Sequence, residues 1–187
     1  MKPALLVIDA QNEYFAPHGQ WTLPDGERAL ERINALIAVA RETDTPVFHI
    51  LHERLGATSG VFVPGSVGAR MYPGLDAAAA EPRILKHFPG SFTQTALAAH
   101  LHQVGADTLV IAGYMTHLCC DTTTRQAKER DLSVLFAADA TATRDLKLNG
   151  ETVPYRTIHE STLAVMGSFA ETLDSEAIAR RLRERKA

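Results

Sequence analysis

The sequence predicts an α/β fold in which helices cover both faces of a parallel sheet. The chain has 187 residues, which is the size of one domain. Hydrophobic residues make up 45% of it and charged residues 22%, as in an average globular domain that buries a core. Short apolar runs alternate along the chain with longer stretches of helical periodicity, and this alternation is typical of βαβ units. We therefore expect one domain over residues 1–187.

The first part of the chain contains two predicted strands and one predicted helix. Residues 4–8 are an apolar run that ends at Asp9, as in a strand buried on both faces of a parallel sheet. Residues 26–43 place their apolar side chains at helical spacing, so they predict an amphipathic helix. Residues 46–51 predict the second strand. The periodicity then fails over residues 56–80, where Gly, Ser and Pro dominate, and long ordered loops often carry function.

The rest of the chain continues the alternation. Ser91 is of a residue type that caps helix N-termini, and a stretch with a periodic apolar face follows it. The apolar run over 108–112 is the clearest strand, and Gly113 closes it. The predicted elements are a short strand over 84–86, a helix over 91–104, strands over 108–112 and 133–138, a helix over 119–130, a polar loop over 139–153, and helices over 154–169 and 175–185.

The composition excludes several classes of function. The net charge of −3 provides no basic surface for nucleic acid or an anionic membrane. No apolar run approaches the ~20 residues that span a bilayer, and two adjacent cysteines cannot form a disulfide framework. The start of the chain lacks the basic and apolar regions of a signal peptide, so we expect a cytoplasmic protein. Motifs for dinucleotide or phosphate binding and the Gly-x-Ser-x-Gly turn of serine hydrolases are absent.

Three chemically useful side chains stand where parallel strands would end. Asp9 and Lys86 each end an apolar run, and Cys119 follows the strand over 108–112. The carboxyl ends of the strands form the binding site in open α/β sheets, so the fold would bring these residues together. Each also has an ordinary interpretation: Asp9 as a turn cap, Lys86 as a surface lysine and Cys119 as an inert buried thiol. An ion pair between Asp9 and Lys86 would favour the functional interpretation.

Cys119 is predicted to lie at a helix N-terminus. Unpaired N–H groups and the helix dipole stabilise an anion there, and a nearby Lys86 ammonium would lower the thiol pKa further. A thiolate in this position is a nucleophile, and the same N–H groups can receive an oxyanion. Cys120 lies about 100° further around the helix, so we expect it to pack in the core. A disulfide between the two cysteines, acting as a redox switch, is the alternative.

The eight histidines do not predict a metal site. His49 and His52 are three residues apart in a predicted strand, so they point to opposite faces, and no third ligand stands at a recognisable spacing. His117 precedes the candidate nucleophile and either contacts substrate or makes a structural hydrogen bond in the turn. His159 lies on the inner side of a predicted helix, where we expect a core histidine. We expect neither a metal nor a cofactor.

Three segments resemble the signature blocks of the isochorismatase-like cysteine hydrolases. They are residues 5–15 (LLVIDAQNEYF), 86–92 (KHFPGSF) and 113–119 (GYMTHLC), in the order of the family and at fitting separations. The resemblance implies a three-layer sandwich around a six-stranded parallel sheet. It also implies a catalytic triad. In that triad Asp9 is the general base, Lys86 favours the thiolate, and Cys119 attacks a carbonyl carbon to form a thioester that water hydrolyses.

The resemblance also implies details of the site. A cis peptide bond would fall at Tyr114-Met115, and the backbone N–H groups of Met115 and Cys119 would form an oxyanion hole. Residues 48–53 lack the Asp and His cluster that binds metal in the nicotinamidases of the family, which favours a metal-independent amidohydrolase acting on a C–N bond of a small molecule. Members are often dimers or tetramers, so we expect a homodimer or homotetramer. The side chains expected to contact substrate are Gln11, Phe15, Trp21, His52, Phe62, Tyr114 and His117.

The residues leave alternatives open. The loop over 56–80 closes either its own site or that of a neighbouring subunit. The same fold without turnover would be a small-molecule or carrier-binding module, in which Cys119 keeps a high thiol pKa. A redox sensor built on Cys119 and Cys120 is a third interpretation, but only the hydrolase uses Asp9 and Lys86 together.

Overall fold

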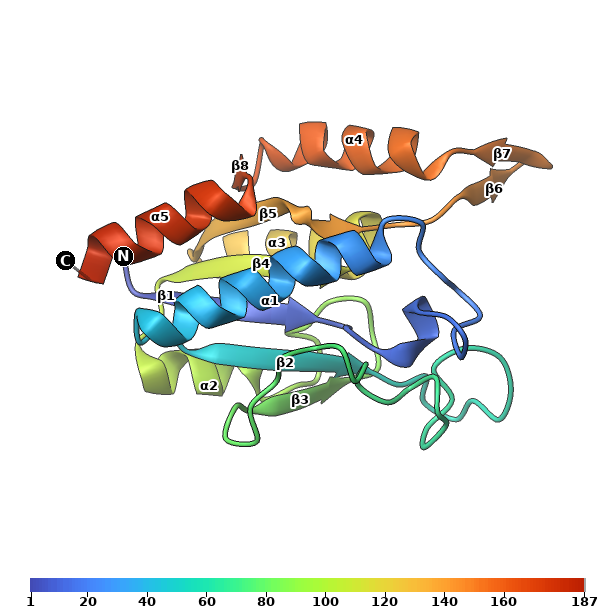
Figure 1. Ribbon diagram of the computed structural model, residues 1–187, viewed down its shortest axis with the longest axis horizontal. Helices are drawn as coiled ribbons and strands as arrows, with labels where there is room; N and C mark the ends of the chain where they lie inside the picture. Colours follow the sequence, from blue (N-terminus) through green and yellow to red (C-terminus); the bar gives the residue numbers. More distant parts are fainter. Residues whose placement is uncertain (187) are drawn as a thin grey trace.

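A central sheet lies between two layers of helices in the computed structural model, which describes residues 1–186 (Figure 1). The sheet has the strand order β3-β2-β1-β4-β5-β8, and all neighbouring strands are parallel. The predicted six-stranded parallel sheet is therefore confirmed, and residue 187, the last of the predicted domain, lies outside the described residues. The strands are β1 (Pro3–Ile8), β2 (Val47–His52), β3 (Arg83–Lys86), β4 (Thr108–Tyr114), β5 (Ser133–Ala142) and β8 (Glu171–Leu173).

Helices cover both faces of this sheet, as predicted. Two of them, α1 and α5, pack together on one face, while α2, α3 and the end of α4 pack on the other (Figure 1). The helices are α1 (Gly26–Glu42), α2 (Leu97–Val104), α3 (Asp121–Lys128), α4 (Tyr155–Met166) and α5 (Ser175–Lys186). None of the helices within residues 1–186 is long and apolar enough to cross a membrane.

Strand β1 is buried on both faces because its side chains supply two hydrophobic cores. Leu5 and Val7 belong to the core under α1 and α5, whereas Leu6 and Ile8 belong to the core under α2 and α3. Fully burying one such side chain stabilises the fold by about 1.5–3 kcal/mol. The continuous apolar run is thus the sequence of a central strand, and it holds Asp9 at the carboxyl end of the sheet.

Two helices begin later than the sequence predicts. The hydroxyl of Ser91 does not cap α2; it pairs with the Thr123 hydroxyl at 2.8 Å, and the Thr95 hydroxyl bonds the Ser91 carbonyl. These side-chain bonds compete with helix formation, so α2 starts only at Leu97. The predicted helix from Cys119 starts at Asp121, because residues 116–120 form a wider turn with a hydrogen bond from Cys120 N to Met115 O.

The segment predicted as a polar loop over 139–153 is more ordered than expected. Strand β5 continues to Ala142, and a hairpin of β6 (Leu146–Leu148) and β7 (Glu151–Val153) follows. Its turn, Asn149-Gly150, has φ values of 52° and 84°, the conformation that favours this dipeptide in two-residue hairpins. Strand β8 was not predicted either, since three residues with two polar side chains carry no apolar run.

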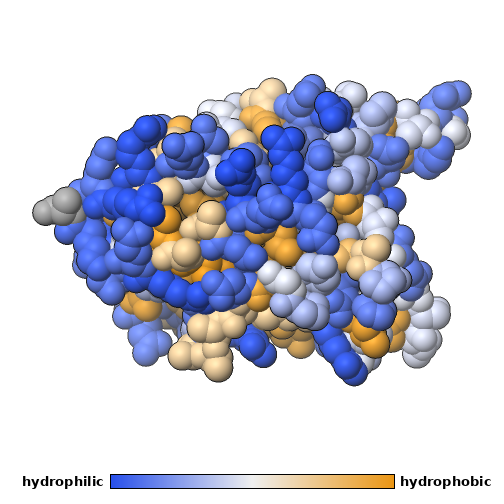
Figure 2. Space-filling view, viewed as in Figure 1, coloured by the Kyte–Doolittle hydropathy of each residue, from blue (hydrophilic) through white to orange (hydrophobic). Residues whose placement is uncertain are grey.

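The carboxyl ends of the strands point to one side of the molecule (Figure 1). The loop between β2 and β3 and the β6–β7 hairpin both extend on that side. Between them the space-filling surface is indented, and mostly hydrophilic residues surround the indentation (Figure 2). Asp9 and the turn after β4 face this side of the sheet, which is where open α/β sheets bind ligands.

Candidate active site

The structure brings Asp9, Lys86 and Cys119 together. Lys86 Nζ lies 2.9 Å from Asp9 Oδ2 and 3.3 Å from Cys119 Sγ. Asp9 and Lys86 are fully buried, and only 4% of Cys119 is exposed. Three residues from the ends of three different strands thus form one cluster, as their positions in the sequence predict. Lys86 is therefore not a surface lysine, and Asp9 is paired with it, while Cys119 is buried as its ordinary interpretation also expects.

Lys86 is surrounded by partners that favour its charged form. Its ammonium also contacts His52 Nδ1 at 3.3 Å and donates to the Phe88 carbonyl at 3.2 Å. Burial by itself lowers the pKa of Lys86, but the Asp9 carboxylate and the contact with the Cys119 sulfur outweigh it, so the pKa is raised. Lys86 is therefore protonated. A buried ammonium is tolerated only where such partners compensate for lost hydration.

Asp9 has acceptor capacity that the protein does not use. Neither of its carboxylate oxygens accepts a hydrogen bond from residues 1–186, although Lys86 Nζ lies within ion-pair distance of one of them. Its backbone is in the left-handed region with a φ of 52°, a conformation that is costly for most residues and common at functional sites. A buried carboxylate with free acceptor positions is suited to take a proton from a neighbouring group.

The thiol of Cys119 is protonated in this environment. Burial raises its pKa, the Asp9 carboxylate raises it further, and the Lys86 ammonium only partly opposes them. The expectation of a lowered thiol pKa is therefore wrong, and the raised pKa is the one expected for the binding-module alternative. The expectation counted the helix end and Lys86 but not the loss of hydration or the charge of Asp9. The hydrolase interpretation rests instead on the grouping of Asp9 and Lys86 with Cys119. Without substrate, Cys119 needs a base to become a nucleophile.

The turn that carries Cys119 has the predicted backbone. The Tyr114-Met115 peptide bond is cis. The carbonyl of Met115 accepts hydrogen bonds from the N–H groups of Leu118 and Cys120, which closes the turn. Cys120 is fully buried in the core under α2 and α3, as predicted, and no disulfide joins it to Cys119.

Three of the expected substrate-contacting residues, His52, Phe62 and Trp21, form a chain of contacts that starts at Lys86, whereas His117 lies against α3 and α4. The ring of His52 packs edge-to-face on Phe62 with ring centres 5.2 Å apart. Phe62 packs in the same way on Trp21, with ring centres 6.1 Å apart. Burial and the Lys86 charge lower the pKa of His52 to about 4, so its ring is neutral. His117 is half-buried and pairs with the Thr143 hydroxyl at 2.6 Å, which is the structural hydrogen bond considered for it.

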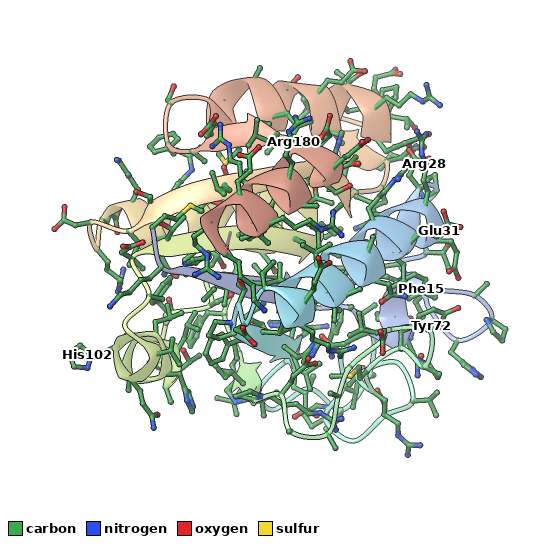
Figure 3. The ribbon with its side chains drawn as sticks, turned by 60° about the vertical axis from the view of Figure 1, so that its left-hand side comes forward. Phe15, Arg28, Glu31, Tyr72, His102 and Arg180 are labelled. Atoms are coloured by element: carbon green, nitrogen blue, oxygen red, sulfur yellow. The ribbon has the colours of Figure 1, made fainter. Side chains whose placement is uncertain are left out.

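The other three expected contact residues are buried and use their polar groups within the protein. The Gln11 side chain donates to the carbonyls of His52 and Ala69 and accepts from the His52 N–H. The Tyr114 hydroxyl donates to the Gly26 carbonyl at 2.7 Å. Phe15 stacks on Tyr72 with ring centres 3.9 Å apart (Figure 3). These side chains hold the loops of the site in place.

Sequence reasoning missed two buried residues next to these loops. The carboxylate of Glu13 accepts hydrogen bonds from the N–H groups of Gln20 and Phe62, at 2.7 and 3.2 Å, and so ties two loops together. Tyr14 contacts Phe62, and burial, with Cys119 and Asp9 close by, raises its pKa well above the usual range. The segment that resembles the first family block contains both, but nothing local predicts that a glutamate there is 2% exposed.

The remaining histidines lie outside the triad. His49 Nε2 pairs with Glu81 at 2.7 Å, on a different part of the sheet from His52. His159 is only half-buried and bonds the Thr116 hydroxyl at 2.9 Å, so the expectation of a core histidine is wrong. Within residues 1–186 no three His, Cys, Asp or Glu side chains are grouped in a way that could hold a metal ion.

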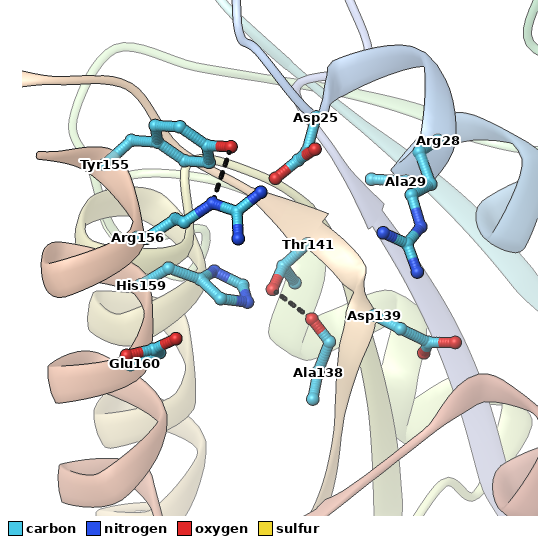
Figure 4. Close-up of a pocket in the computed structure, with 10 residues that line it drawn as sticks. All are labelled: Asp25, Arg28, Ala29, Ala138, Asp139, Thr141, Tyr155, Arg156, His159 and Glu160. Atoms are coloured by element: carbon cyan, nitrogen blue, oxygen red, sulfur yellow. Dashed lines mark hydrogen bonds between the residues drawn. The ribbon is translucent and has the colours of Figure 1, made fainter.

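A polar cavity of about 250 Å³ lies between α1, β5 and α4 (Figure 4). It contains no triad residue. His159, in its wall, reaches the turn before Cys119 through its bond to Thr116. The lining mixes both signs of charge and comprises Asp25, Arg28, Ala29, Ala138, Asp139, Thr141, Tyr155, Arg156, His159 and Glu160.

The chain is similar to known proteins over most of its length. The chain is 35% identical to the uncharacterized isochorismatase family protein YddQ of Bacillus subtilis strain 168, over 95% of this chain and 98% of that protein. It is 27% identical to nicotinamidase 3 of Arabidopsis thaliana, over 96% and 88% of the two chains. It is also 27% identical to the maleamate amidohydrolase of Pseudomonas putida KT2440, over 76% and 73%.

A solved structure and a family model extend the comparison to the fold and the whole domain. The crystal structure of an isochorismatase from Pseudomonas putida KT2440 is similar with a TM-score of 0.86 and 32% identity, over 94% of this chain and 89% of that one. The family model of the isochorismatase domain matches residues 3–176. The chain therefore belongs to the isochorismatase family.

Proposed function

We propose that this protein is a metal-independent cysteine hydrolase that cleaves the amide-type C–N bond of a small molecule. One observation carries the proposal: a buried carboxylate with unused acceptor positions shares a lysine with a protonated thiol. Relatives named for the hydrolysis of amides, a nicotinamidase and a maleamate amidohydrolase, support the same reaction class. Only 4% of Cys119 is exposed, which favours a small substrate.

Asp9 would act as the base in the first step. It takes the thiol proton of Cys119, and the sulfur attacks the carbonyl carbon of the amide as the C=O electron pair moves onto oxygen. The backbone N–H groups of Met115 and Cys119 would donate to that oxyanion. One such donor typically contributes about 3 kcal/mol to lowering the barrier. Lys86 stays an ammonium throughout and balances the charge of Asp9 and the thiolate.

The same carboxyl group would complete the reaction. The tetrahedral intermediate collapses, the C–N bond breaks, and protonated Asp9 returns its proton to the leaving nitrogen. Water, activated by Asp9, then attacks the thioester, the C–S bond breaks, and the acid is released while Cys119 recovers its proton. The two steps together consume one water molecule and need no oxidant or metal.

The test is turnover of small primary amides, followed by ammonia release. We expect Cys119→Ala and Asp9→Asn each to lower kcat by about a thousandfold or more, since each removes a group that acts on the reacting atoms. Cys120→Ala is the matched control and should keep activity within a few-fold. Rapid quenching of the wild type should give an acyl adduct on Cys119 by mass spectrometry. Turnover that survives in Cys119→Ala would refute a cysteine nucleophile, and a wild type that turns over no amide would leave a binding module.

A further inference from the structure

Thr116, in the turn that carries Cys119, bonds a histidine from a distant part of the chain. Its hydroxyl pairs with Nδ1 of His159 on α4 at 2.9 Å. Thr116 is fully buried, whereas His159 is half-buried and its ring points into the polar cavity between α1, β5 and α4 (Figure 4). The proposed reaction uses neither side chain. Because a buried hydroxyl without a partner is costly, this bond fixes the turn against α4.

The surroundings of His159 set the direction of this hydrogen bond. Burial lowers the pKa of His159, and the nearby carboxylates of Asp25 and Glu160 only partly oppose it, so the ring is neutral at pH 7. A neutral imidazole carries one N–H. The Ala138 carbonyl acts on the ring as a hydrogen-bond acceptor, so the proton belongs on Nε2. Nδ1 is then an acceptor, and the Thr116 hydroxyl donates to it.

Met115 lies between two neighbours that are both held by side-chain hydrogen bonds. Before it, the Tyr114 hydroxyl donates to the Gly26 carbonyl at the start of α1, at 2.7 Å. After it, Thr116 is held by His159. The N–H of Met115 is one of the two donors proposed for the oxyanion. Its direction therefore depends on how the residues on either side are fixed.

Helix α4 has its own attachment to the rest of the fold. Of its residues only Met166, at its end, is buried, and it packs in the core under α2 and α3. His159 lies about two helical turns earlier on the same helix. The helix is thus held at Met166, and the bond from His159 acts on the turn.

The position of an oxyanion donor affects the reaction more than it affects binding. The substrate oxygen becomes an anion only in the tetrahedral intermediate, so a displaced donor raises the barrier to that intermediate and hardly changes the binding of a neutral amide. Complete removal of one donor typically lowers kcat by about a hundredfold to a thousandfold. A donor that is displaced but present should lower it less.

We propose that His159 is a positioning residue for the oxyanion hole: by accepting the hydrogen bond of Thr116, it holds the Met115 N–H in the direction that the oxyanion requires. The inference rests on the proposed hydrolase function and adds to it a residue from outside the triad. In this role His159 contacts no reacting atom, and it neither gives nor takes a proton during the reaction.

Two reagents that react with the same sulfur separate the oxyanion hole from the nucleophile. Acylation of Cys119 by p-nitrophenyl acetate forms a C–S bond and an oxyanion, which collapses as the C–O bond to p-nitrophenolate breaks. Alkylation by iodoacetamide forms a C–S bond as iodide leaves, without an oxyanion. Thr116→Val and His159→Leu should each lower the acylation rate about tenfold or more and change the alkylation rate less than threefold. Mass spectrometry assigns both adducts to Cys119.

Conservative variants and a matched control test the hydrogen bond itself. Thr116→Ser keeps the hydroxyl and His159→Asn keeps an acceptor close to the position of Nδ1, so each should recover part of the acylation rate. The double variant Thr116→Val/His159→Leu should acylate no more slowly than the slower single variant, because both changes remove one bond. Thr162→Val is the control, since the Thr162 hydroxyl bonds the Ile158 carbonyl of its own helix at 2.8 Å, and it should change neither rate.

Turnover of amides distinguishes the failure of this inference from the failure of the proposed function. If the wild type turns over an amide, His159→Leu should lower kcat by the same factor as acylation and leave KM within threefold. Acylation at the wild-type rate in Thr116→Val and His159→Leu would overturn the role of His159, and so would an equal loss of acylation and alkylation. A wild type without amide turnover, in which the variants still lose acylation alone, would refute the hydrolase and keep the positioning role.

Discussion

The acid–base behaviour of Cys119 depends on neighbouring charges of opposite sign. Burial and the Asp9 carboxylate raise its thiol pKa, and the Lys86 ammonium lowers it. A thiol kept protonated in the empty site resists oxidation and alkylation, because the thiolate is the reactive form. Proton transfer to Asp9 would then occur when a substrate carbonyl is in place. The cysteine would thus combine low background reactivity with catalysis.

This arrangement predicts opposite shifts in two variants. Asp9→Asn removes a negative charge that raises the thiol pKa, so the pKa of Cys119 should fall. Lys86→Met removes a positive charge that lowers it, so the pKa should rise. The pH profile of iodoacetamide alkylation at Cys119, followed by mass spectrometry, measures both. Asp9→Asn should therefore alkylate faster at neutral pH although it no longer turns over substrate.

Asp107→Asn is the control for a general change in charge. Asp107 precedes β4 at the opposite end of the sheet and pairs with the N–H of Lys2. Removing the charge of Asp107 should not shift the pH profile of Cys119 alkylation. A profile that moved in the same direction in Asp9→Asn and Lys86→Met would contradict the electrostatic account and indicate that both variants simply open the site.

At the level of elements, hydrogen bonds hold the long loop between β2 and β3 at two places: at Phe62, near the site, and at Glu81, just before β3. Glu81 bonds His49 of β2 at 2.7 Å and Arg41 of α1 at 2.8 Å. It also accepts the N–H of Ala78 at 2.9 Å. Burial raises the pKa of Glu81, but these hydrogen bonds outweigh it and lower the pKa to about 2. The carboxylate therefore connects the loop, the sheet and a helix.

Stability should depend on the charge of Glu81. The pKa of Glu81 is about 2 in the folded protein and 4.5 for a glutamate in an unfolded chain. Between these pH values the unfolded chain therefore binds more protons. The stabilisation is present above pH 4.5 and is lost as the pH falls towards 2. His49 acts in the same direction, because burial lowers its pKa below 6.5 and the unfolded chain takes up that proton first.

Urea unfolding of Glu81→Gln against pH tests this linkage. We expect the variant to be less stable than the wild type by on the order of 2 kcal/mol at pH 7, and the difference to shrink towards pH 3. Glu31→Gln, on the exposed face of α1 (Figure 3), is the control and should match the wild type throughout. A difference between wild type and Glu81→Gln that stayed constant with pH would show that shape, not charge, is what matters there.

For the molecule as a whole, local patterns predict the scaffold and the triad but not the residues that shape the site. The apolar run before Asp9 and the strand before the cysteine turn are encoded in a few adjacent residues, so sequence suffices for them. The burial of Glu13 arises only when distant loops meet. Neither residue type nor spacing carries that information. The same holds for the short strand β8, which is defined by its pairing with β5.

The two adjacent cysteines allow local and global opening to be compared in one experiment. Cys120 is fully enclosed by the core under α2 and α3, so its modification requires that core to open. Cys119 belongs to the same core but is 4% exposed and contacts Lys86. The His52 ring beside Lys86 packs against Phe62 of a loop that Glu13 joins, so we expect opening of that loop to suffice. Local openings expose little surface and depend weakly on denaturant, whereas global unfolding depends on it strongly. We therefore expect N-ethylmaleimide to label Cys119 faster, with a shallow urea dependence, and Cys120 with the full unfolding slope.

Glu13→Gln tests this prediction further, because it should make the loops that Glu13 joins open more easily without changing how the core around Cys120 opens. A glutamine has a single carbonyl oxygen and cannot accept from both Gln20 and Phe62, so one of the two buried N–H groups loses its partner, at a cost of about 1–3 kcal/mol. Labelling of Cys119 should accelerate about tenfold at low urea. The slope for Cys120 should stay the same, and its transition should move only by the loss of overall stability. If both cysteines label with one common urea dependence in wild type and variant, the loops and the core open together, and substrate would then have to enter through the indentation without movement of these loops.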